Sequence, residues 1–292
     1  MSDAGTPAAE PGYLLDNAQA QAQGRFAGLE ASFDTLTQRH LAARGLRPGW
    51  RCLEVGAGSG SVARWLASQA GPDGSVLATD IDTRWAETGR LPNLEVIQHD
   101  IVTDPLPGGA FDLIHARLVL VHLPARNQVL ARLVAALKPG GWLVTEDFDS
   151  SLPHCLDPAT GEEQAFIKVG QALVGALHRR GADTTYPRTL PHRLRSAGLA
   201  DVGASGHLVI YHGGSPEAVL QQAGLDQIGP SLVDAGLITA TDLQTAQRLL
   251  RDPAFIANHP LMITAWGPNP ASRPSRAPPR GHSHGEVTRP AN

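Results

Sequence analysis

The sequence of 292 residues is poor in cysteine, in lysine and in long apolar runs, and each shortage excludes a class of protein. Two cysteines, Cys52 and Cys155, are too few for a disulfide framework, and they favour a reducing, cytoplasmic location. No apolar run reaches the roughly 18 residues that a membrane span requires. The N-terminus also lacks the basic and then apolar pattern of a signal peptide.

The chain also has no excess of positive charge. The formal net charge is −4, and Lys138 and Lys168 are the only lysines. A nucleic-acid-binding surface is usually strongly basic, so this composition argues against a nucleic-acid partner. Hydrophobic residues make up 42% and charged residues 18%, which is typical of a globular domain with a sizeable core. We therefore expect a globular protein, a monomer or a homodimer, with no nucleic-acid or membrane partner.

One stretch, residues 51–61 (RCLEVGAGSGS), organises the rest of the chain. Residues 52–55 form a short apolar run of strand length, and glycine then occupies every second position, 56, 58 and 60. A helical pattern follows from residue 62 and stops at Gly71-Pro72. Strand, glycine turn and helix together form the first half of a nucleotide-binding βα unit.

The glycine spacing separates the possible ligands. A dinucleotide-binding G-x-G-x-x-G turn would need glycine at position 61, where Ser61 stands, and a P-loop would need a lysine nearby. The sequence instead reads E-x-G-x-G-x-G, beginning at Glu54. Such a turn has no phosphate cradle, but Glu54 and the loop carbonyls could accept hydrogen bonds from an ammonium group.

Further strands are expected at 75–79, 94–98, 110–115 and 142–145, with a helix opened by Pro124 before the last of them. An acid follows three of these strands: Asp80, Asp100 and Asp147. Asp80, at the end of the second strand, stands where an acid can hold the two hydroxyls of a ribose.

These features, together with F-D-L-I at 111–114, L-V-L-V-H-L at 118–123 and L-K-P-G-G at 137–141, resemble the class I S-adenosylmethionine-dependent methyltransferases. The resemblance is to the small-molecule branch seen in quinone biosynthesis, and it covers about residues 50–150. It implies an α/β fold: a Rossmann-like, seven-stranded, mostly parallel sheet with the last strand antiparallel. It also implies S-adenosyl-L-methionine as the cofactor and a small-molecule acceptor.

The resemblance carries over to specific positions. It implies that Asp100 meets the adenine amino group and that Ile101 packs on the adenine ring. Arg117, just past the fourth strand, could meet the methionine carboxylate. The full set of expected cofactor-binding residues is Glu54, Gly56, Ala57, Gly58, Gly60, Asp80, Ile81, Asp100, Ile101 and Arg117.

The catalytic residues stay open. An oxygen or carbon acceptor must lose a proton, which calls for a base such as histidine. The candidates are His122, His154 and Asp147, with His115 and His178 less favoured. No metal is expected: the acids after the fifth strand have no asparagine partner, and His282 and His284 lie in a polar tail.

Around the core, residues 1–10 and 268–292 are expected to be disordered, and residues 11–267 to form the methyltransferase domain. Its core is expected at about 48–150 and 188–267, where the patterns predict a long strand at 201–212 and a last strand at 255–266. A cap helix is expected at about 160–181 and extra helices at about 215–252. The helical pattern at 13–43 fits a packing helix or a cofactor lid equally well.

Two other functions remain as alternatives. A nicotinamide-dependent oxidoreductase is disfavoured by Ser61, and a non-catalytic S-adenosylmethionine-binding regulator or partner subunit would share the same motifs. DNA-amino and cytosine-C5 methylation are disfavoured, since neither [DN]-P-P-[FY] nor a Pro-Cys pair is present. The favoured interpretation is methyl transfer to a small, natural-product-like acceptor under the cap, at an oxygen, nitrogen or carbon atom.

Overall fold

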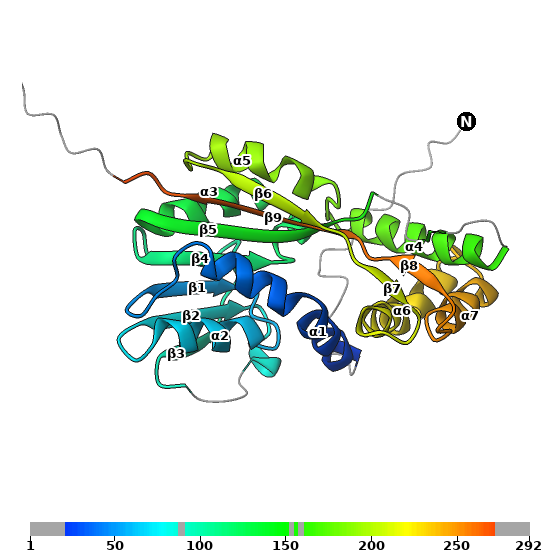
Figure 1. Ribbon diagram of the computed structural model, residues 1–292. Coiled ribbons are helices and arrows are strands. Elements are labelled where there is room, and N and C mark those ends of the chain that lie inside the picture. The colour runs from blue at the N-terminus through cyan, green and yellow to red at the C-terminus, as the bar shows by residue number, and fades with distance from the viewer. Residues whose placement is uncertain (1–20, 87–90, 152–154, 157–160, 272–292) are drawn as a thin grey trace, which may run out of the picture.

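The computed structural model describes residues 21–86, 91–151, 155–156 and 161–271. Figure 1 shows a sheet with helices on its two faces, and a second group of helices beyond one end of its strands. The long helix α1 (Gln21–Ala42) runs from the sheet toward that second group. The terminal segments that we expected to be disordered lie outside the described residues, apart from residues 268–271.

The seven-stranded sheet has the order β3-β2-β1-β4-β5-β9-β6. Strands β1 to β5 are parallel, while β9 is antiparallel to both of its neighbours, β5 and β6. The expected mostly parallel sheet with an antiparallel last strand is therefore confirmed. The strands are β1 (Arg51–Val55), β2 (Ser75–Asp80), β3 (Leu94–Gln98), β4 (Phe111–Arg117), β5 (Leu137–Asp149), β6 (Gly203–His207) and β9 (Leu261–Pro268).

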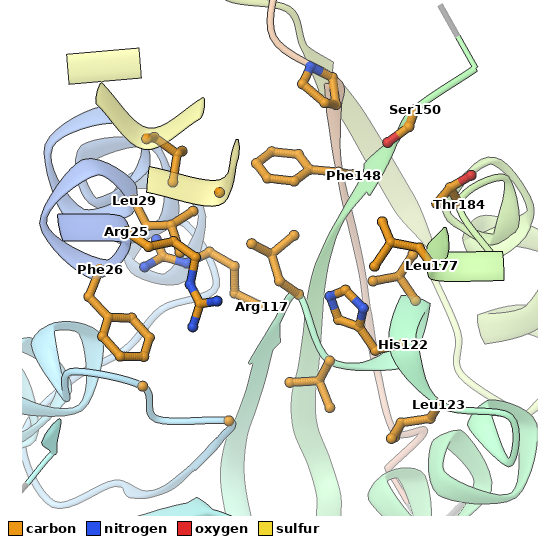
Figure 2. A pocket seen from close by; sticks show the side chains of 18 of the residues that line it. Arg25, Phe26, Leu29, Arg117, His122, Leu123, Phe148, Ser150, Leu177 and Thr184 are labelled. Atoms are coloured by element: carbon orange, nitrogen blue, oxygen red, sulfur yellow. The ribbon is translucent and has the colours of Figure 1, made fainter. Parts of the chain in front are cut away.

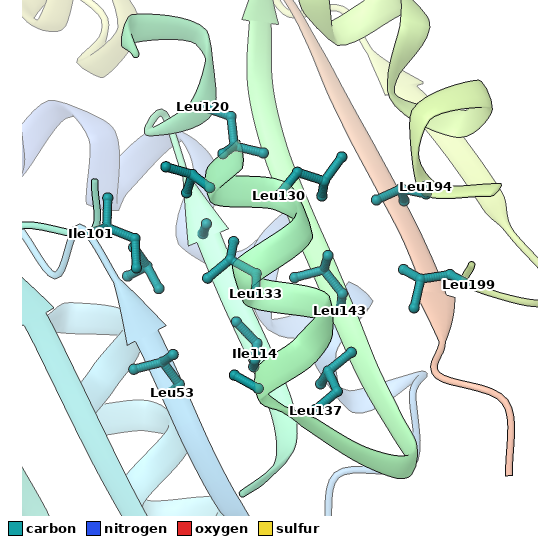
Figure 3. Packing of buried hydrophobic residues seen from close by; sticks show 14 of the residues in the cluster. Leu53, Ile101, Ile114, Leu120, Leu130, Leu133, Leu137, Leu143, Leu194 and Leu199 are labelled. Carbon is teal, nitrogen blue, oxygen red and sulfur yellow. The ribbon is translucent and has the colours of Figure 1, made fainter. Parts of the chain in front are cut away.

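The side chains of successive residues in each central strand point to opposite faces of the sheet, as the pleat requires. Leu53 packs with α3 (Arg126–Ala136) and α5 (Leu190–Ser196) on one face, which Figure 3 shows. Its neighbour Cys52 packs with α1 and α2 (Ser61–Ala70) on the other. Because both faces are covered, the central strands read as continuous apolar runs.

The second group of helices is a cap with its own apolar core. It consists of α4 (Gly161–Arg179), α6 (Pro216–Asp234), α7 (Ala240–Leu249) and the two-stranded ribbon of β7 (Ile210–His212) and β8 (Ile256–Asn258). Ser215 caps α6, and Thr239 with Asp242 forms a capping box at the start of α7.

Two predicted strands are wrong in extent. The strand expected at 201–212 is divided into β6 and β7, and the one expected at 255–266 into β8 and β9. In each pair the segments lie in different sheets, because β7 and β8 leave the main sheet to pair with each other in the cap. Pro260 stands at the second break, where its missing N–H cannot support a ladder hydrogen bond.

Two smaller features complete the fold. The strand expected at 142–145 is part of the longer β5, which includes the L-K-P-G-G motif and pairs with β4 from Leu137 onward through a register shift. Short 3₁₀ helices occur at η1 (Thr83–Trp85), η2 (Leu120–His122) and η3 (Tyr186–Thr189). In the described part of the chain, no helix combines the length and the apolar character needed to cross a membrane.

Candidate functional site

A cavity of about 630 Å³ lies where the carboxyl ends of the parallel strands meet the cap. Its walls come from α1, from the glycine turn, from the segments that follow β2, β3, β4 and β5, and from α4, α6 and β7 of the cap. Figure 2 shows Arg25 and Phe26 reaching in from α1 on one side, and His122 and Leu177 from the other. Ligands of open α/β sheets bind at this edge.

The three glycines of the turn have backbone conformations that favour glycine: φ is +73° at Gly56, +54° at Gly58 and +77° at Gly60. A β-carbon on Gly56 would come within 2.5 Å of Val119, and one on Gly58 within 2.9 Å of the Phe26 ring. Gly56, Ala57 and Gly58 line the cavity, whereas Gly60 begins α2. The turn therefore leaves room for a ligand against its backbone but no room for a side chain at position 56 or 58.

Asp80, at the end of β2, supports this turn and faces the cavity. Its Oδ2 accepts a hydrogen bond from the N–H of Gly58 at 2.9 Å, and its Oδ1 accepts one from Asp82 at 3.0 Å. Burial raises the pKa of the carboxyl group, and these backbone hydrogen bonds oppose that rise. The side chain is 8% exposed and lines the cavity, beside the more exposed Ile81.

The segment after β3 supplies a second wall of the same region. Asp100 and Ile101 both line the cavity, as do their neighbours His99 and Val102. The Oδ1 of Asp100 accepts the N–H of Val102 at 2.8 Å, which fixes the loop, and Ile101 is almost fully buried. All the expected cofactor-binding residues except Gly60 thus face one cavity.

A buried ionic group lies beneath the turn. Glu54, at the cavity wall, accepts a hydrogen bond from Nδ1 of His115 at 2.7 Å, and Nε2 of the same ring is 3.3 Å from Glu146. Burial by itself lowers the pKa of His115, but the two carboxylates outweigh burial and raise it to about 9. Burial likewise raises the pKa of Glu146, yet His115 and Arg117 lower it to about 2.

Helix α1 contributes residues that the sequence analysis did not single out. Arg25, Phe26, Leu29 and Glu30 line the cavity, and Glu30 accepts a hydrogen bond from Ser59 of the glycine turn. Arg117 also lines the cavity, and its guanidinium donates to Asp34 at 2.9 Å and to Thr37 at 3.0 Å, both on α1. Of the two roles left open for this helix, the geometry fits a lid over the turn.

The cap side of the cavity is mainly apolar. Four residues of α4 at helical spacing, Phe166, Val169, Leu173 and Leu177, all line it. Further residues of α6, of the β5 end, of β7 and of the segment after β8 also line it, and nothing in their spacing points to a site: Leu220, Leu225, Phe148, Tyr211 and His259. Ser150 and Thr184 add hydroxyl groups to this wall.

Of the three candidate bases, His122 lines the cavity and Asp147 does not. His122 lines the cavity, and burial, with Arg25 and Arg126, lowers its pKa to about 4. Asp147 does not line the cavity: its side chain is buried behind the η2 segment, where Oδ1 accepts the N–H of Val121 at 3.4 Å. His154 lies outside the described residues.

The two less favoured histidines are also accounted for. His115 is fully buried between its two carboxylates and does not line the cavity. His178 is hydrogen-bonded through Nε2 to the Thr184 hydroxyl at 2.8 Å. Among the described residues, no group of three or more His, Cys, Asp and Glu side chains could hold a metal ion.

Comparison with known proteins identifies relatives of this chain. A family model described as "Methyltransferase domain" matches residues 21–228. Methyltransferase str3 of Strobilurus tenacellus is 33% identical over 197 residues, covering 66% of this chain and 68% of that protein. The ubiquinone/menaquinone biosynthesis C-methyltransferase UbiE of Cupriavidus necator is 32% identical over 114 residues, but only 37% of this chain and 47% of that protein are covered.

Solved structures support the fold. Phosphoethanolamine N-methyltransferase 2 of Haemonchus contortus, in complex with phosphomonomethylethanolamine and S-adenosylhomocysteine, superposes with a TM-score of 0.55 at 16% identity. The match covers 88% of this chain and 59% of that one. The YcgJ protein of Bacillus subtilis gives a TM-score of 0.51 at 15% identity, with 80% and 98% covered. At such low identities the likeness concerns the fold alone.

Proposed function

The chain belongs to the S-adenosylmethionine-dependent methyltransferase family, and we propose that it methylates a small, mainly apolar acceptor held between the glycine turn and the cap. One observation carries the proposal: a single cavity of about 630 Å³ joins the expected cofactor residues to the apolar face of α4. Ligand sites for small molecules typically measure about 300–1,000 Å³.

At the turn, the residues present fit the cofactor. The backbone of Gly56 and Gly58 lines the cavity, and a side chain at either position would collide with its neighbours. Asp80 lines the same cavity, and we propose that its carboxylate binds the ribose hydroxyls. We propose Asp100 and Ile101 for the adenine, Glu54 for the amino group and Arg117 for the carboxylate, with Ala57 and Ile81 at the edges of the site. The bound cofactor supplies an electrophilic methyl group on a sulfonium sulfur.

At the cap, the lining explains why the acceptor should be small and apolar. Leu173 and Leu177 of α4 and Leu220 of α6 line the cavity, so an apolar molecule gains from leaving water there. A closed apolar wall also keeps water away from the methyl group and holds the acceptor in line with it. An extended polymer would have to displace α1 or the cap helices, which disfavours a nucleic acid or protein acceptor.

We propose His122 as the base that removes the acceptor proton. It follows β4, between the turn and the cap, and it lines the cavity. Because its pKa is lowered to about 4, the ring is neutral at physiological pH and can accept a proton. Asp147 is a poorer candidate, since its carboxyl group is buried away from the cavity and burial raises its pKa to about 8.

The acceptor atom follows from the same features. The neutral imidazole of His122 suits an acceptor with one acidic proton, such as a phenol or an activated ring carbon. The UbiE relative is named a C-methyltransferase, although less than half of its length is covered. We propose that the acceptor is an aromatic molecule of this kind, methylated at oxygen or carbon.

The protein is proposed to act as a monomer or homodimer, in which residues 11–267 form the methyltransferase domain.

The test is a turnover assay with the full chain and S-adenosylmethionine carrying an isotopically labelled methyl group. A panel of phenols and quinols, and then a metabolite extract, is incubated with the protein, and labelled products are sought by mass spectrometry. Label in a small aromatic product supports the proposal. Label only in protein or nucleic acid, with none in small molecules, would overturn it. A Gly58→Val variant serves as the blank, because the added side chain would fill the turn.

A further inference from the structure

The ring of His115 lies between two carboxylates, with no exposed surface. Its Nδ1 is 2.7 Å from Oε2 of Glu54, and its Nε2 is 3.3 Å from Oε2 of Glu146. A neutral imidazole has one N–H and could donate to only one of these acceptors. With both glutamates ionised, the two contacts require an imidazolium that donates to each carboxylate.

Glu146 is held from its far side by two further elements. The hydroxyl of Thr37, on α1, donates to its Oε2, and the hydroxyl of Thr264, on β9, donates to its Oε1 at 2.9 Å. With three hydrogen bonds accepted, Glu146 stays ionised. Its position fixes the tilt of the His115 ring, and through that ring the position of Glu54.

The charges of this buried group do not cancel. Glu54 and Glu146 carry two negative charges and His115 one positive charge, while Arg117 is balanced by Asp34 at 2.9 Å. One negative charge remains, and Glu54 is the member of the group that lines the cavity. His115 occupies Oε2 of Glu54, which leaves Oε1 for a ligand. A buried, uncompensated charge of this kind favours a cationic partner.

We propose that His115 is a positioning residue, which holds Glu54 ionised and turned so that Oε1 accepts a hydrogen bond from the ammonium group of the bound cofactor. The proposal rests on the proposed function. It assigns His115 a role in recognising the amino-acid end of the ligand and none in recognising the nucleoside end. His115 itself touches neither the cavity nor the reacting atoms.

The protonation balance supports this assignment. Burial raises the pKa of Glu54, and the charge and hydrogen bond of His115 are the first forces that oppose this rise. Arg117 acts in the same direction as His115, and Glu146 acts against it. Without the imidazolium, Glu54 would bind a proton more readily and lose the charge that attracts an ammonium group.

Two ligands separate positioning from a structural role. S-adenosylhomocysteine carries the amino-acid end, and 5′-methylthioadenosine has the adenine, the ribose and the sulfur without it. Calorimetry on the full chain compares both ligands for the wild type, for His115→Gln and for His212→Gln, the same change at an exposed position of β7. We expect His115→Gln to bind S-adenosylhomocysteine about 10- to 100-fold more weakly, as for a lost hydrogen bond to a charged group. Methylthioadenosine should bind all three proteins equally.

A pH series gives a second readout. In the wild type, affinity for S-adenosylhomocysteine should be flat between pH 6 and pH 8. In His115→Gln it should fall as the pH is lowered, because Glu54 takes up a proton more readily without the imidazolium beside it. Methylthioadenosine affinity should stay flat in both proteins. No such slope would appear if His115 only supported the sheet.

The outcomes are distinct. Equal weakening of both ligands, or no weakening of either, overturns the proposal. If the wild type binds neither ligand, the cofactor assignment itself fails. Should His115→Gln not fold, the same comparison is made with Glu146→Gln, which releases the ring from its other side. There, too, a loss confined to S-adenosylhomocysteine supports the proposal, and an equal loss for both ligands overturns it.

Discussion

The ring of Phe26 in α1 lies directly against the backbone of Gly58, so that a β-carbon on Gly58 would come within 2.9 Å of Phe26 Cε1. Helix α1 therefore closes over the segment that the sequence identifies as the cofactor turn. The N-terminal helix and the βα core are separated by the loop after residue 42, yet they build one wall of the cavity.

Gly58→Val should abolish measurable binding of S-adenosylhomocysteine. The valine would need a left-handed backbone, since φ is +54° there, and would also meet the Phe26 ring. The matched control is Gly140→Val, because Gly140 has φ of +82° with nothing within 4 Å of its added β-carbon. Calorimetry and thermal melting of both variants separate backbone strain, which they share, from occlusion of the site. Binding retained in Gly58→Val would place the ligand elsewhere.

Asp80→Ala should weaken S-adenosylhomocysteine binding by about 10- to 150-fold without unfolding the protein, as expected for a lost hydrogen bond of about 1.5–3 kcal/mol to a charged group. Asp82→Ala is the control: its carboxylate pairs with Arg84 near the surface and does not line the cavity. An unchanged dissociation constant in Asp80→Ala would show that another group holds the ribose.

Leu173→Ala, on the cavity face of α4, should raise the acceptor KM or lower turnover while cofactor affinity changes little. Phe166 is a less suitable probe, because its ring also packs against Phe255 at 5.0 Å inside the cap core. The control is Val219→Ala at an exposed position of α6. If α4 only packs, Leu173→Ala should lower the melting temperature and leave the kinetics of the folded protein unchanged.

His122→Gln should lower kcat by about 10²- to 10⁴-fold, the range for general base catalysis, with cofactor affinity unchanged. Since the pKa of His122 is lowered to about 4, the base is already unprotonated at pH 6. The wild-type kcat/KM, which reports the free enzyme, should therefore not fall through His122 between pH 8 and pH 6, and an acid limb should emerge only near pH 4 to 5. His212→Gln is the control. Full activity in His122→Gln would rule out this base.

The parts of the site that the sequence predicted lie close together along the chain. Glu54, Gly58, Asp80 and Asp100 stand at or just after the carboxyl ends of neighbouring strands, so short motifs suffice to place them. Apolar spacing likewise placed the α4 face. Both patterns are local in sequence. Each predicts correctly which residues share one cavity, because the strands and the helix that carry them are regular.

The remaining parts depend on long-range packing that no local pattern encodes. Thr37 meets Glu146 across 109 residues, and Arg117 meets Asp34 across 83. Tyr211 and His259 reach the cavity only because β7 and β8 leave the main sheet and pair in the cap. Both stretches are rich in apolar residues on either side of the break, so the sequence favoured one long strand in each place.

Asp147→Asn should stabilise the protein above neutral pH. Burial raises the pKa of Asp147 to about 8 in the folded state, whereas an unfolded aspartate has a pKa near 3.8. A carboxyl group with a raised pKa contributes stability below pH 3.8 that is lost as the pH rises toward 8, because the unfolded chain gives up its proton first. Asparagine is neutral throughout and can keep the acceptor for Val121 N–H. The difference in melting temperature between variant and wild type should thus grow in favour of the variant from pH 5 to pH 8. Thermal melts at both values measure it, and a constant difference would show that Asp147 does not titrate in the folded protein.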